Sequence, residues 1–317
     1  MKISVSIPVY NSPVEYLRRT IESVLAQEGD FELEVILSDD ASEVDYGPLV
    51  QAYASAPITF AWNATNLGMV GNWNAAVRRS TGELVILLGH DDLLAPGMFA
   101  AYAEVLASDP EVVLCACARS FIDEDGSTAE PRRAVNDRAN IFLREERYVL
   151  EGQDAIRLCL RNGNVIGEPS AVMYRRSVFD RLGGYDPAFG HAADVDFNLR
   201  ASELGRIVYL RRPFLRRRLH QANLTRRNLA TGELTVDRVR LFERFAIGRG
   251  FSAREIAEFR AHLVARSSFD LLRSTAHGRW PAAKLAARSV VRHVRPTPLV
   301  YGRYLYEIVS GRNRDAR

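Results

Sequence analysis

The stretch LVILLGHDD, residues 84–92, decides the fold class of this chain. It is an apolar run that ends in glycine, histidine and two carboxylates, as is typical of a buried strand followed by a polar loop. Two earlier stretches have the same form, ISVSIPVYN at residues 3–11 and EVILSDDAS at residues 34–42. Further strands are expected at Ile58–Trp62 and Val112–Ala118.

Helical patterns separate these strands. One helix is expected to begin at Pro13 and to end near Ala26, with Ser12 and Glu15 as a capping box. Others are expected from about Met69 and from Pro96. Strands that alternate with helices predict an α/β fold with a mostly parallel sheet covered on both faces. Ligands of such sheets bind at the carboxyl ends of the strands.

After residue 118 the pattern is less regular. FIDEDGS at residues 121–127 predicts a hairpin turn, and residues 130–147 predict a long polar loop. Residues 171–174 predict a short strand, residues 194–204 a helix, and residues 207–210 and 214–220 two strands.

From about Thr235 the pattern is helical, with a second capping box at Ser252 and Glu255. We therefore expect one α/β domain over residues 1–220, made of a nucleotide-binding half (1–118) and an acceptor half (119–220). Residues 221–317 are expected to form a basic helical extension.

The composition is that of a folded protein, with 47% hydrophobic and 26% charged residues among 317. No apolar run is long enough to span a membrane, and the first residues lack the apolar core of a secretory signal. The odd, sparse set of three cysteines fits a reducing compartment. We expect a cytoplasmic protein, and we interpret Cys115 and Cys117 as residues of a buried strand.

The net charge of +3 hides a strong asymmetry along the chain. Residues 1–200 hold 17 Lys and Arg against 30 Asp and Glu, whereas residues 201–317 hold 25 against 9. A basic C-terminal third indicates an anionic partner such as phosphate, acidic lipid or nucleic acid. The alternative is that it neutralises the acidic first part within the fold.

Two adjacent carboxylate pairs, Asp39-Asp40 and Asp91-Asp92, follow two of the predicted strands. Carboxylates that share a cleft repel each other and require a cation or a hydrogen-bond donor. A hard divalent ion that also binds phosphates satisfies this requirement. The structural alternative is that one pair caps the helix that follows it.

Together these features resemble family 2 of the glycosyltransferases, which have the GT-A fold. The resemblance covers roughly residues 1–220. It rests on VSIPVYN (5–11), LSDDAS (37–42), NLGMVGNWNAA (66–76), TGE (81–83), LGHDD (88–92), GGYDP (183–187) and DVDFNLR (194–200). Each motif is weak alone, but their order along the chain is that of the family.

The resemblance implies an inverting hexosyl or deoxyhexosyl transferase that binds a nucleotide-sugar donor. Asp39 is expected to read the base, because a carboxylate accepts the ring N3–H of uracil and equally of thymine. UDP and dTDP donors therefore stay open, with guanine a less favoured third option. The residues expected to bind the nucleotide are Pro8, Tyr10, Asn11, Asp39, Asp40, Asn66, Gly68, Asn74 and His90.

The resemblance also implies a Mn2+ or Mg2+ cofactor. Gly89 stands where the family's Asp-x-Asp motif has its first aspartate, so Asp91 becomes the main metal ligand and Asp92 an assisting one. His220 aligns with a family histidine that can ligate the metal or contact the diphosphate, although a surface role is an alternative. His90 is either a further ligand or an orienting group.

Asp194 aligns with the family's general base, which takes the proton from the acceptor hydroxyl. Asp196 lies about 200° further around the same helix, so both cannot face the substrate, and we expect a structural role for Asp196. Arg216, Arg217 and Arg218 are either diphosphate ligands or a solvated strand edge.

The expected partners are the donor and a hydroxyl acceptor on a cell-surface polysaccharide or lipid-linked glycan; no nucleic-acid-binding module is recognised. A non-catalytic nucleotide-sugar-binding or regulatory protein on the same fold is the main alternative. A dinucleotide-dependent oxidoreductase is disfavoured, because no Gly-x-Gly-x-x-Gly follows the first strand.

Residues 281–295 predict a helix bounded by Pro296, with Lys284, Arg288, Arg292 and Arg295 on one face. Leu285, Val290, Val291 and Val294 are expected away from that row, as in an interfacial helix, and Tyr301, Tyr304 and Tyr306 follow. An anionic membrane surface is therefore one expected partner. The alternative is that the helix packs on the catalytic domain and its cations face acidic groups.

Overall fold

The computed structural model describes residues 1–129, 142, 144–220 and 231–293. These residues contain one nine-stranded sheet with the order β3-β2-β1-β4-β8-β6-β9-β5, and β7 pairs with β9. The strands are β1 Lys2–Val9, β2 Glu32–Asp39, β3 Ile58–Trp62, β4 Leu84–Leu87, β5 Leu93–Leu94, β6 Val112–Ile122, β7 Arg147–Leu150, β8 Val172–Arg175 and β9 Arg206–Arg218.

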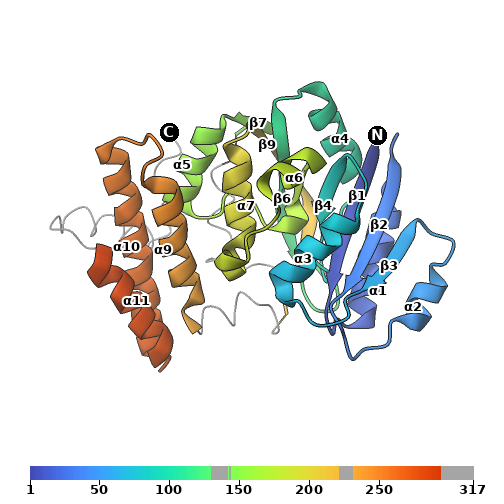
Figure 1. The fold of residues 1–317 in the computed structure, drawn as a ribbon, viewed down its shortest axis with the longest axis horizontal. Helices are drawn as coiled ribbons and strands as arrows, with labels where there is room; N and C mark the ends of the chain where they lie inside the picture. The colour runs from blue at the N-terminus through green and yellow to red at the C-terminus, as the bar shows by residue number, and fades with distance from the viewer. Residues whose placement is uncertain (130–141, 143, 221–230, 294–317) are drawn as a thin grey trace.

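Helices cover both faces of the sheet and continue beyond one end of it (Figure 1). They are α1 Val14–Leu25, α2 Gly47–Ala52, α3 Gly68–Arg79, α4 Met98–Ser108, α5 Gly152–Asn162, α6 Arg176–Leu182, α7 Ala193–Ser202, α9 Glu233–Ala246, α10 Ala253–Ala276 and α11 Trp280–His293, with short 3-10 helices η3 Pro169–Ala171 and η4 Pro187–Ala192.

The first four strands in chain order form the parallel part of the sheet, as the alternating pattern predicts. Pro8 lies opposite Ser38 and Val9 opposite Asp39, so β1 and β2 end at the same level. β8 then pairs antiparallel with β4 and β6, while β6 and β9 are parallel. The polar residues that follow β1, β2 and β4 therefore share one edge of the sheet.

The apolar strand residues divide between two cores, one on each side of the sheet. One core joins β1, β2 and β4 to α1 and α4, and it contains Cys115 and Cys117, which are buried as expected. The other joins the sheet to α3, α5 and α7, and also takes in Phe242 and Phe245 of α9 and Phe259 of α10. The first two C-terminal helices thus share a core with the acceptor half.

Several local expectations are confirmed. The hairpin after β6 closes with Asp123 N–H donating to Ser127 O at 2.9 Å, and the Ser252–Glu255 capping box opens α10. The two strands expected at residues 207–220 are one strand, β9, with irregular pairing to β6 near Pro213. The loop expected at residues 130–147 lies mostly outside the described residues.

The capping box expected at the start of α1 is wrong. The helix begins at Val14, after an extended Pro13, without a side-chain cap. Ser12 is buried and its backbone N–H donates to the Tyr46 hydroxyl at 2.7 Å. Glu15 instead forms ion pairs with Arg18 and Arg19, which lie one helical turn after it. Its carboxylate therefore does not cap the start of the helix.

Helix α11 packs on α9 and α10 rather than on the sheet (Figure 1). Its inner face consists of small residues, Ala282, Ala283, Ala286 and Ser289, and Ser289 Oγ lies 3.0 Å from Ser267 Oγ of α10. Small side chains allow the two helix backbones to approach closely. Across the described part of the chain, no helix combines the length and apolar character that crossing a membrane requires.

On the outer face of α11 an apolar residue lies beside the cations, whereas the sequence predicted apolar residues away from them. Lys284 and Arg288 are exposed, but Val291 lies on the same side of the helix and is 80% exposed. Arg292 pairs with Glu243 of α9 at 2.7 Å, which supports the neutralising alternative for that one cation. Arg295, Val294 and the three tyrosines lie outside the described residues.

Candidate active site

Asp39 stands at the end of β2, beside the turn that follows β1. Its carboxylate accepts the hydroxyl proton of Ser42, and that hydroxyl oxygen in turn accepts the backbone N–H of Asn11 at 2.8 Å. Asn11 adopts a φ of 47°, and its Oδ1 accepts the Glu43 N–H at 2.9 Å. The two strand ends are thus tied together, with the exposed Tyr10 ring beside them.

Asp40, expected to contact the nucleotide, points into the protein. Its side chain is 2% exposed, and Oδ1 accepts both the Asn63 amide at 2.8 Å and the Leu67 N–H at 2.8 Å. Its backbone carbonyl accepts the Asn66 amide at 3.2 Å. Asp40 therefore holds the loop between β3 and α3 against the end of β2.

A buried amide network supports the same strand ends and was not expected from the sequence. Asn72 of α3 donates to Val9 O at 3.3 Å and to Ser38 O at 2.9 Å, while its Oδ1 accepts from Ser38 and Asn63. Arg79 donates to Asn63 Oδ1 at 2.7 Å. Only the position of Asn72 on an otherwise apolar helix face could have suggested this role.

Asn74, expected to contact the nucleotide, binds the backbone of Tyr185. Its amide nitrogen donates to Tyr185 O at 2.9 Å and its oxygen accepts Tyr185 N–H at 2.9 Å. Gly184, at φ 92°, permits this approach, since an added Cβ would lie 2.4 Å from Asn74 Oδ1. Asn66 forms a local turn by accepting Gly68 N–H at 2.9 Å, and Gly68 adopts φ 73°.

Asp91 and His220 meet at the end of β4, as the predicted metal site requires. Asp91 Oδ2 lies 2.8 Å from His220 Nε2, and both side chains are about one-seventh exposed. Burial raises the pKa of Asp91, but the bond from His220 and the charge of His90 outweigh it and leave the pKa lowered. Burial lowers the pKa of His90. Asp91 is therefore an ionised and partly exposed carboxylate in the loop after β4.

Asp92, expected to assist Asp91 in holding the metal directly or through water, faces inward. Its Oδ2 accepts the Ser170 hydroxyl at 2.6 Å and its Oδ1 accepts Arg218 N–H at 3.1 Å. Burial, and then the charge of Asp91, raise the pKa of Asp92 to about 7. A Cβ at Gly89 would lie 3.0 Å from Asp91 Oδ1 and 3.2 Å from Asp92 Oδ2, so glycine gives the carboxylates room to converge.

The three consecutive arginines of β9 have different environments. Arg218 is fully buried, donates to Asp91 O at 3.0 Å and to Asp123 O at 2.9 Å, and lies over the Tyr16 ring at 4.5 Å. Arg216 donates to Gly126 O at 3.4 Å. Both arginines therefore bind the hairpin after β6.

Arg217 lies among the acidic residues of the site. The nearby Glu168 raises the pKa of Arg217; burial opposes this, and the charges of Asp92, Asp91 and Asp194 raise it further. One guanidinium therefore interacts with the strand-end carboxylates and with the predicted base. The tertiary structure brings together two groups of residues that lie about a hundred positions apart in the chain.

Asp194 opens helix α7 and is only partly buried. Burial raises its pKa to about 7; Glu168 contributes in the same direction, while the Val195 N–H and Arg217 oppose it. Its Oδ2 accepts the Asn164 amide at 3.4 Å. A carboxylate with such a pKa is suited to taking a proton near neutral pH.

Asp196 has the structural role expected of it. Its side chain is fully buried and forms ion pairs with Arg200 at 2.8 Å and with Arg244 of α9 at 2.9 Å. Arg200 also donates to Leu182 O at 3.0 Å and to Gly184 O at 2.8 Å. Asp194 and Asp196 therefore face different surroundings, as their angular separation on a helix predicts.

Glu168 and Ser170 belong to the site but were not expected from the sequence. Glu168 pairs with Arg119 at 2.5 Å and lies 3.7 Å from Arg217, while Ser170 binds Asp92 and also accepts the Gly89 N–H at 3.0 Å. A signal was available, because Glu168 is a lone carboxylate in GNVIGEPS (163–170), the turn between a helix and a strand.

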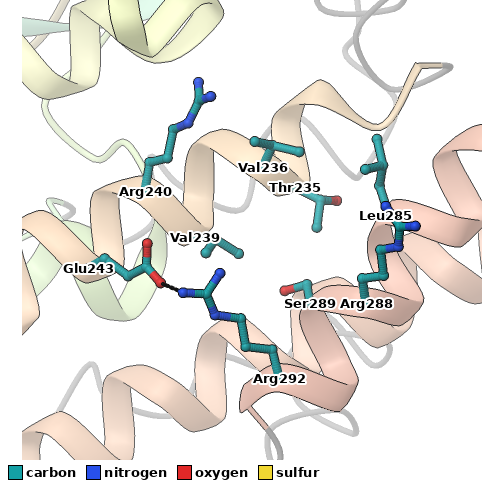
Figure 2. A pocket seen from close by; sticks show the side chains of 9 residues that line it. All are labelled: Thr235, Val236, Val239, Arg240, Glu243, Leu285, Arg288, Ser289 and Arg292. Carbon is teal, nitrogen blue, oxygen red and sulfur yellow. Dashed lines mark ion pairs between the residues drawn. The ribbon is translucent and has the colours of Figure 1, made fainter.

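Figure 2 shows a pocket between α9 and α11, remote from these residues. Val236, Val239 and Leu285 line it, and Arg240, Arg288 and Arg292 surround it. None of the candidate site residues contributes to it, so it is not the predicted donor site.

Comparison with known proteins settles the family. The sequence model of glycosyl transferase family 2 matches residues 4–183. The chain belongs to glycosyl transferase family 2. A Mycobacterium tuberculosis protein, MT1568, is 29% identical over 242 residues, which cover 75% of this chain and 74% of that protein.

Solved structures of other glycosyltransferases show the same GT-A fold. S. aureus TarS 1–349 superposes with a TM-score of 0.62 at 15% identity, over 100% of this chain and 95% of that one. The mannosyltransferase PcManGT of Pyrobaculum calidifontis, in complex with GDP-Man and Mn2+, has a TM-score of 0.55 at 20% identity, covering 98% and 85% of the two chains. The family and fold expected from the motifs are confirmed.

Proposed function

We propose that this family 2 glycosyltransferase transfers a hexosyl or deoxyhexosyl group from a UDP- or dTDP-sugar to a hydroxyl acceptor with inversion. The observation that carries the proposal is Arg217, which lies 3.7 Å from Glu168 and whose charge interacts with Asp91, Asp92 and Asp194. A donor diphosphate near Asp91 and an acceptor hydroxyl near Asp194 would then lie within reach of each other.

Asp194 supplies the base in this proposal. As the acceptor oxygen bonds to the anomeric carbon, its proton passes to the Asp194 carboxylate. The bond from the anomeric carbon to the diphosphate oxygen breaks on the opposite face, which inverts the configuration. The pKa of about 7 suits this role, because the group is substantially ionised at neutral pH and still basic.

Asp39 is proposed to contact the base and His90 to lie beside the diphosphate. Pro8, Tyr10 and Asn11 surround the end of β1 and form the wall next to Asp39. Asn66 and Gly68 form the turn that opens α3 on the same edge of the sheet. All of these groups lie at the carboxyl edge of the parallel strands, where ligands of such sheets bind.

A divalent ion, Mn2+ or Mg2+, fits the Asp91–His220 pair. Within the described residues no three His, Cys, Asp or Glu side chains gather into a complete metal cluster. Two protein donors are sufficient for ions that complete their coordination with phosphate oxygens and water. When bound, the ion would neutralise the charge of the diphosphate leaving group, and PcManGT with GDP-Man and Mn2+ is a precedent on this fold.

Titration of UDP into the protein, with Mn2+ and with EDTA, tests donor binding, and a screen of nucleotide sugars for transfer or hydrolysis tests catalysis. We expect UDP or dTDP to bind more tightly with Mn2+, and at least one of their sugars to be consumed. Metal-assisted binding without turnover of any donor would favour the alternative, a non-catalytic nucleotide-sugar-binding protein. Binding of NAD instead of UDP would contradict both.

We also propose that the enzyme works at an anionic membrane surface on a lipid-linked or cell-surface glycan. The support is the outer face of α11, where Trp280 is 67% and Val291 80% exposed beside Lys284 and Arg288. In the described structure neither of these two cations has an ion-pair partner. Aromatic and basic side chains together suit a membrane–water boundary.

Co-sedimentation with anionic vesicles tests the membrane proposal. Binding should fall as salt rises, and replacement of Lys284 and Arg288 by glutamate should weaken it, since each cation contributes roughly 1 kcal/mol near an anionic surface. Arg254→Glu is the matched control, because Arg254 is an exposed helix cation at another place. Equal binding of all three proteins would remove the support for a membrane role of α11.

A further inference from the structure

One guanidinium joins the two ends of the segment that carries Asp194. Nη1 of Arg244 on α9 lies 2.9 Å from an oxygen of Asp186 and 2.9 Å from an oxygen of Asp196. The same guanidinium lies 5.1 Å from the centre of the Phe189 ring, within the loop that it closes. Asp194 lies two residues before the second anchor.

Other side chains of α9 bind the same segment. Arg240 donates to Ala188 O at 2.7 Å, and Glu233 lies 2.8 Å from His191 Nε2. Asp237 is buried; burial raises its pKa to about 6, and the backbone N–H of Ala192 opposes this stronger effect. These residues and Arg244 recur at intervals of four, three and four, so they form one face of the helix. One face of α9 therefore contacts the segment that precedes α7.

The segment needs this support because its own backbone is irregular. Gly190 has φ 46° and ψ −109°, which interrupts η4 immediately before α7. The Asp194 carboxylate accepts a long hydrogen bond of 3.4 Å from the side-chain amide of Asn164. The direction of the Asp194 carboxylate therefore depends on where the first turn of α7 is held.

We propose that Arg244 is a positioning residue for the acceptor base, and that helix α9 is a functional part of the acceptor site. The inference rests on the proposed role of Asp194, since Arg244 itself touches no reacting atom. It gives the basic C-terminal extension a task in the reaction that is separate from any membrane contact.

Removal of Arg244 should leave the fold intact. Asp196 keeps its 2.8 Å pair with Arg200, which also stays bound to Leu182 O and Gly184 O. Asp186 is partly exposed and keeps the Ala188 N–H at 3.0 Å. The loss is the connection between the two carboxylates, so we expect a change in position rather than unfolding.

Steady-state kinetics of Arg244→Ala test the proposal. We expect kcat to fall about 10- to 100-fold, the scale of effect of a small misplacement of a catalytic group, with donor KM within about threefold of wild type. Arg244→Lys should recover part of kcat, because an ammonium keeps the positive charge between the two carboxylates but loses the contact of the planar guanidinium with the Phe189 ring. If Arg244→Ala does not fold, Asp186→Asn removes one of the two anchors and should give the smaller change in the same direction.

Arg238→Ala is the matched control. Arg238 lies on the same helix and pairs with Asp270 of α10, with no described contact to residues 186–196. It should lose stability without a selective loss of kcat. A kcat for Arg244→Ala within about twofold of wild type, or an equal loss in Arg238→Ala, would overturn the positioning role.

Hydrogen exchange supplies a readout that does not depend on turnover. Amides of residues 187–195 should exchange at least about tenfold faster in Arg244→Ala than in wild type or Arg238→Ala. Unchanged protection would overturn the inference even in an active enzyme. If the wild type transfers no sugar, the proposed function fails, and the exchange rates still decide whether Arg244 holds the segment.

Discussion

The ends of β2 and β4 carry the same dipeptide, Asp-Asp, and the structure uses both in the same way. In each pair the first carboxylate lies at the site: Asp39 beside the β1 turn and Asp91 against His220. The second is turned inward: Asp40 holds the loop before α3, and Asp92 holds Ser170 and the backbone of β9. We propose that the first carboxylate of each pair meets a ligand, while the second holds the neighbouring loop or strand.

The start of α7 repeats this division at a spacing of two residues. Asp194 is partly exposed beside Arg217 and Glu168, whereas Asp196 is buried between Arg200 and Arg244. Two carboxylates close in sequence thus have different partners and different burial. Single substitutions of the two members of a pair should therefore differ: one should lower activity or binding, and the other should lower stability.

The α7 pair should give the largest contrast. Asp194→Asn should lower kcat at least about a hundredfold, because the amide cannot accept the acceptor proton, with nucleotide affinity unchanged. Asp196→Asn should mainly lower the melting temperature, since it leaves two arginines beside a neutral group in the interior. Kinetics and thermal unfolding measure the two effects. A crippled but stable Asp196→Asn enzyme beside an active Asp194→Asn enzyme would reverse our assignment.

The β4 pair should give the next largest effect. Asp91→Ala or His220→Ala should weaken Mn2+-dependent nucleotide binding by at least about tenfold, the scale seen when the surroundings of a metal are disturbed. Asp92→Asn keeps the shape and the Ser170 contact, so its binding should stay within about threefold. Calorimetry with Mn2+ and with EDTA measures this. Undiminished transfer by Asp91→Ala in EDTA would exclude metal assistance through this residue.

The pH dependence sharpens the contrast within the α7 pair. Because the pKa of Asp194 is about 7, kcat should fall about tenfold per pH unit below that value and level off above it. The raised pKa also means that stability falls as pH rises from about 4, where an unfolded aspartate ionises, to about 7, where Asp194 ionises in the folded state. Asp194→Asn should therefore melt higher than wild type at pH 8, and by a smaller margin at pH 5. A flat kcat profile between pH 5 and 8 would argue against Asp194 as the base.

The β2 pair should give the smallest effects. Asp39→Asn should weaken UDP binding about fivefold, because a neutral acceptor replaces a charged one. Asp40→Ala removes the acceptor of two buried hydrogen bonds and should lower the melting temperature by a few degrees. Titration of UDP and thermal unfolding compare them. Equal losses of affinity without loss of stability would show that Asp40 faces the donor after all.

Much of the fold could be predicted from local patterns. The strands at residues 3–9, 34–38, 58–62 and 84–88 and the cap of α10 were expected from runs of apolar residues and from Ser252 and Glu255, and the structure contains them. These features depend on neighbours within a few positions, so the linear order of residues is sufficient. The order of the motifs likewise identified the family before any geometry was known.

The tertiary structure alone decided the hydrogen-bond partners of each carboxylate. Asp91 is bound by His220, which follows β9 and lies 129 positions later in the chain. Asn74 is bound by the backbone of Tyr185, 111 positions later, through both of its amide groups. A buried polar side chain must be satisfied by whatever partner the fold brings beside it, and local sequence carries no record of that partner. The sequence therefore determined where the carboxylates stand along the chain, and long-range hydrogen bonds decided what each of them is free to do.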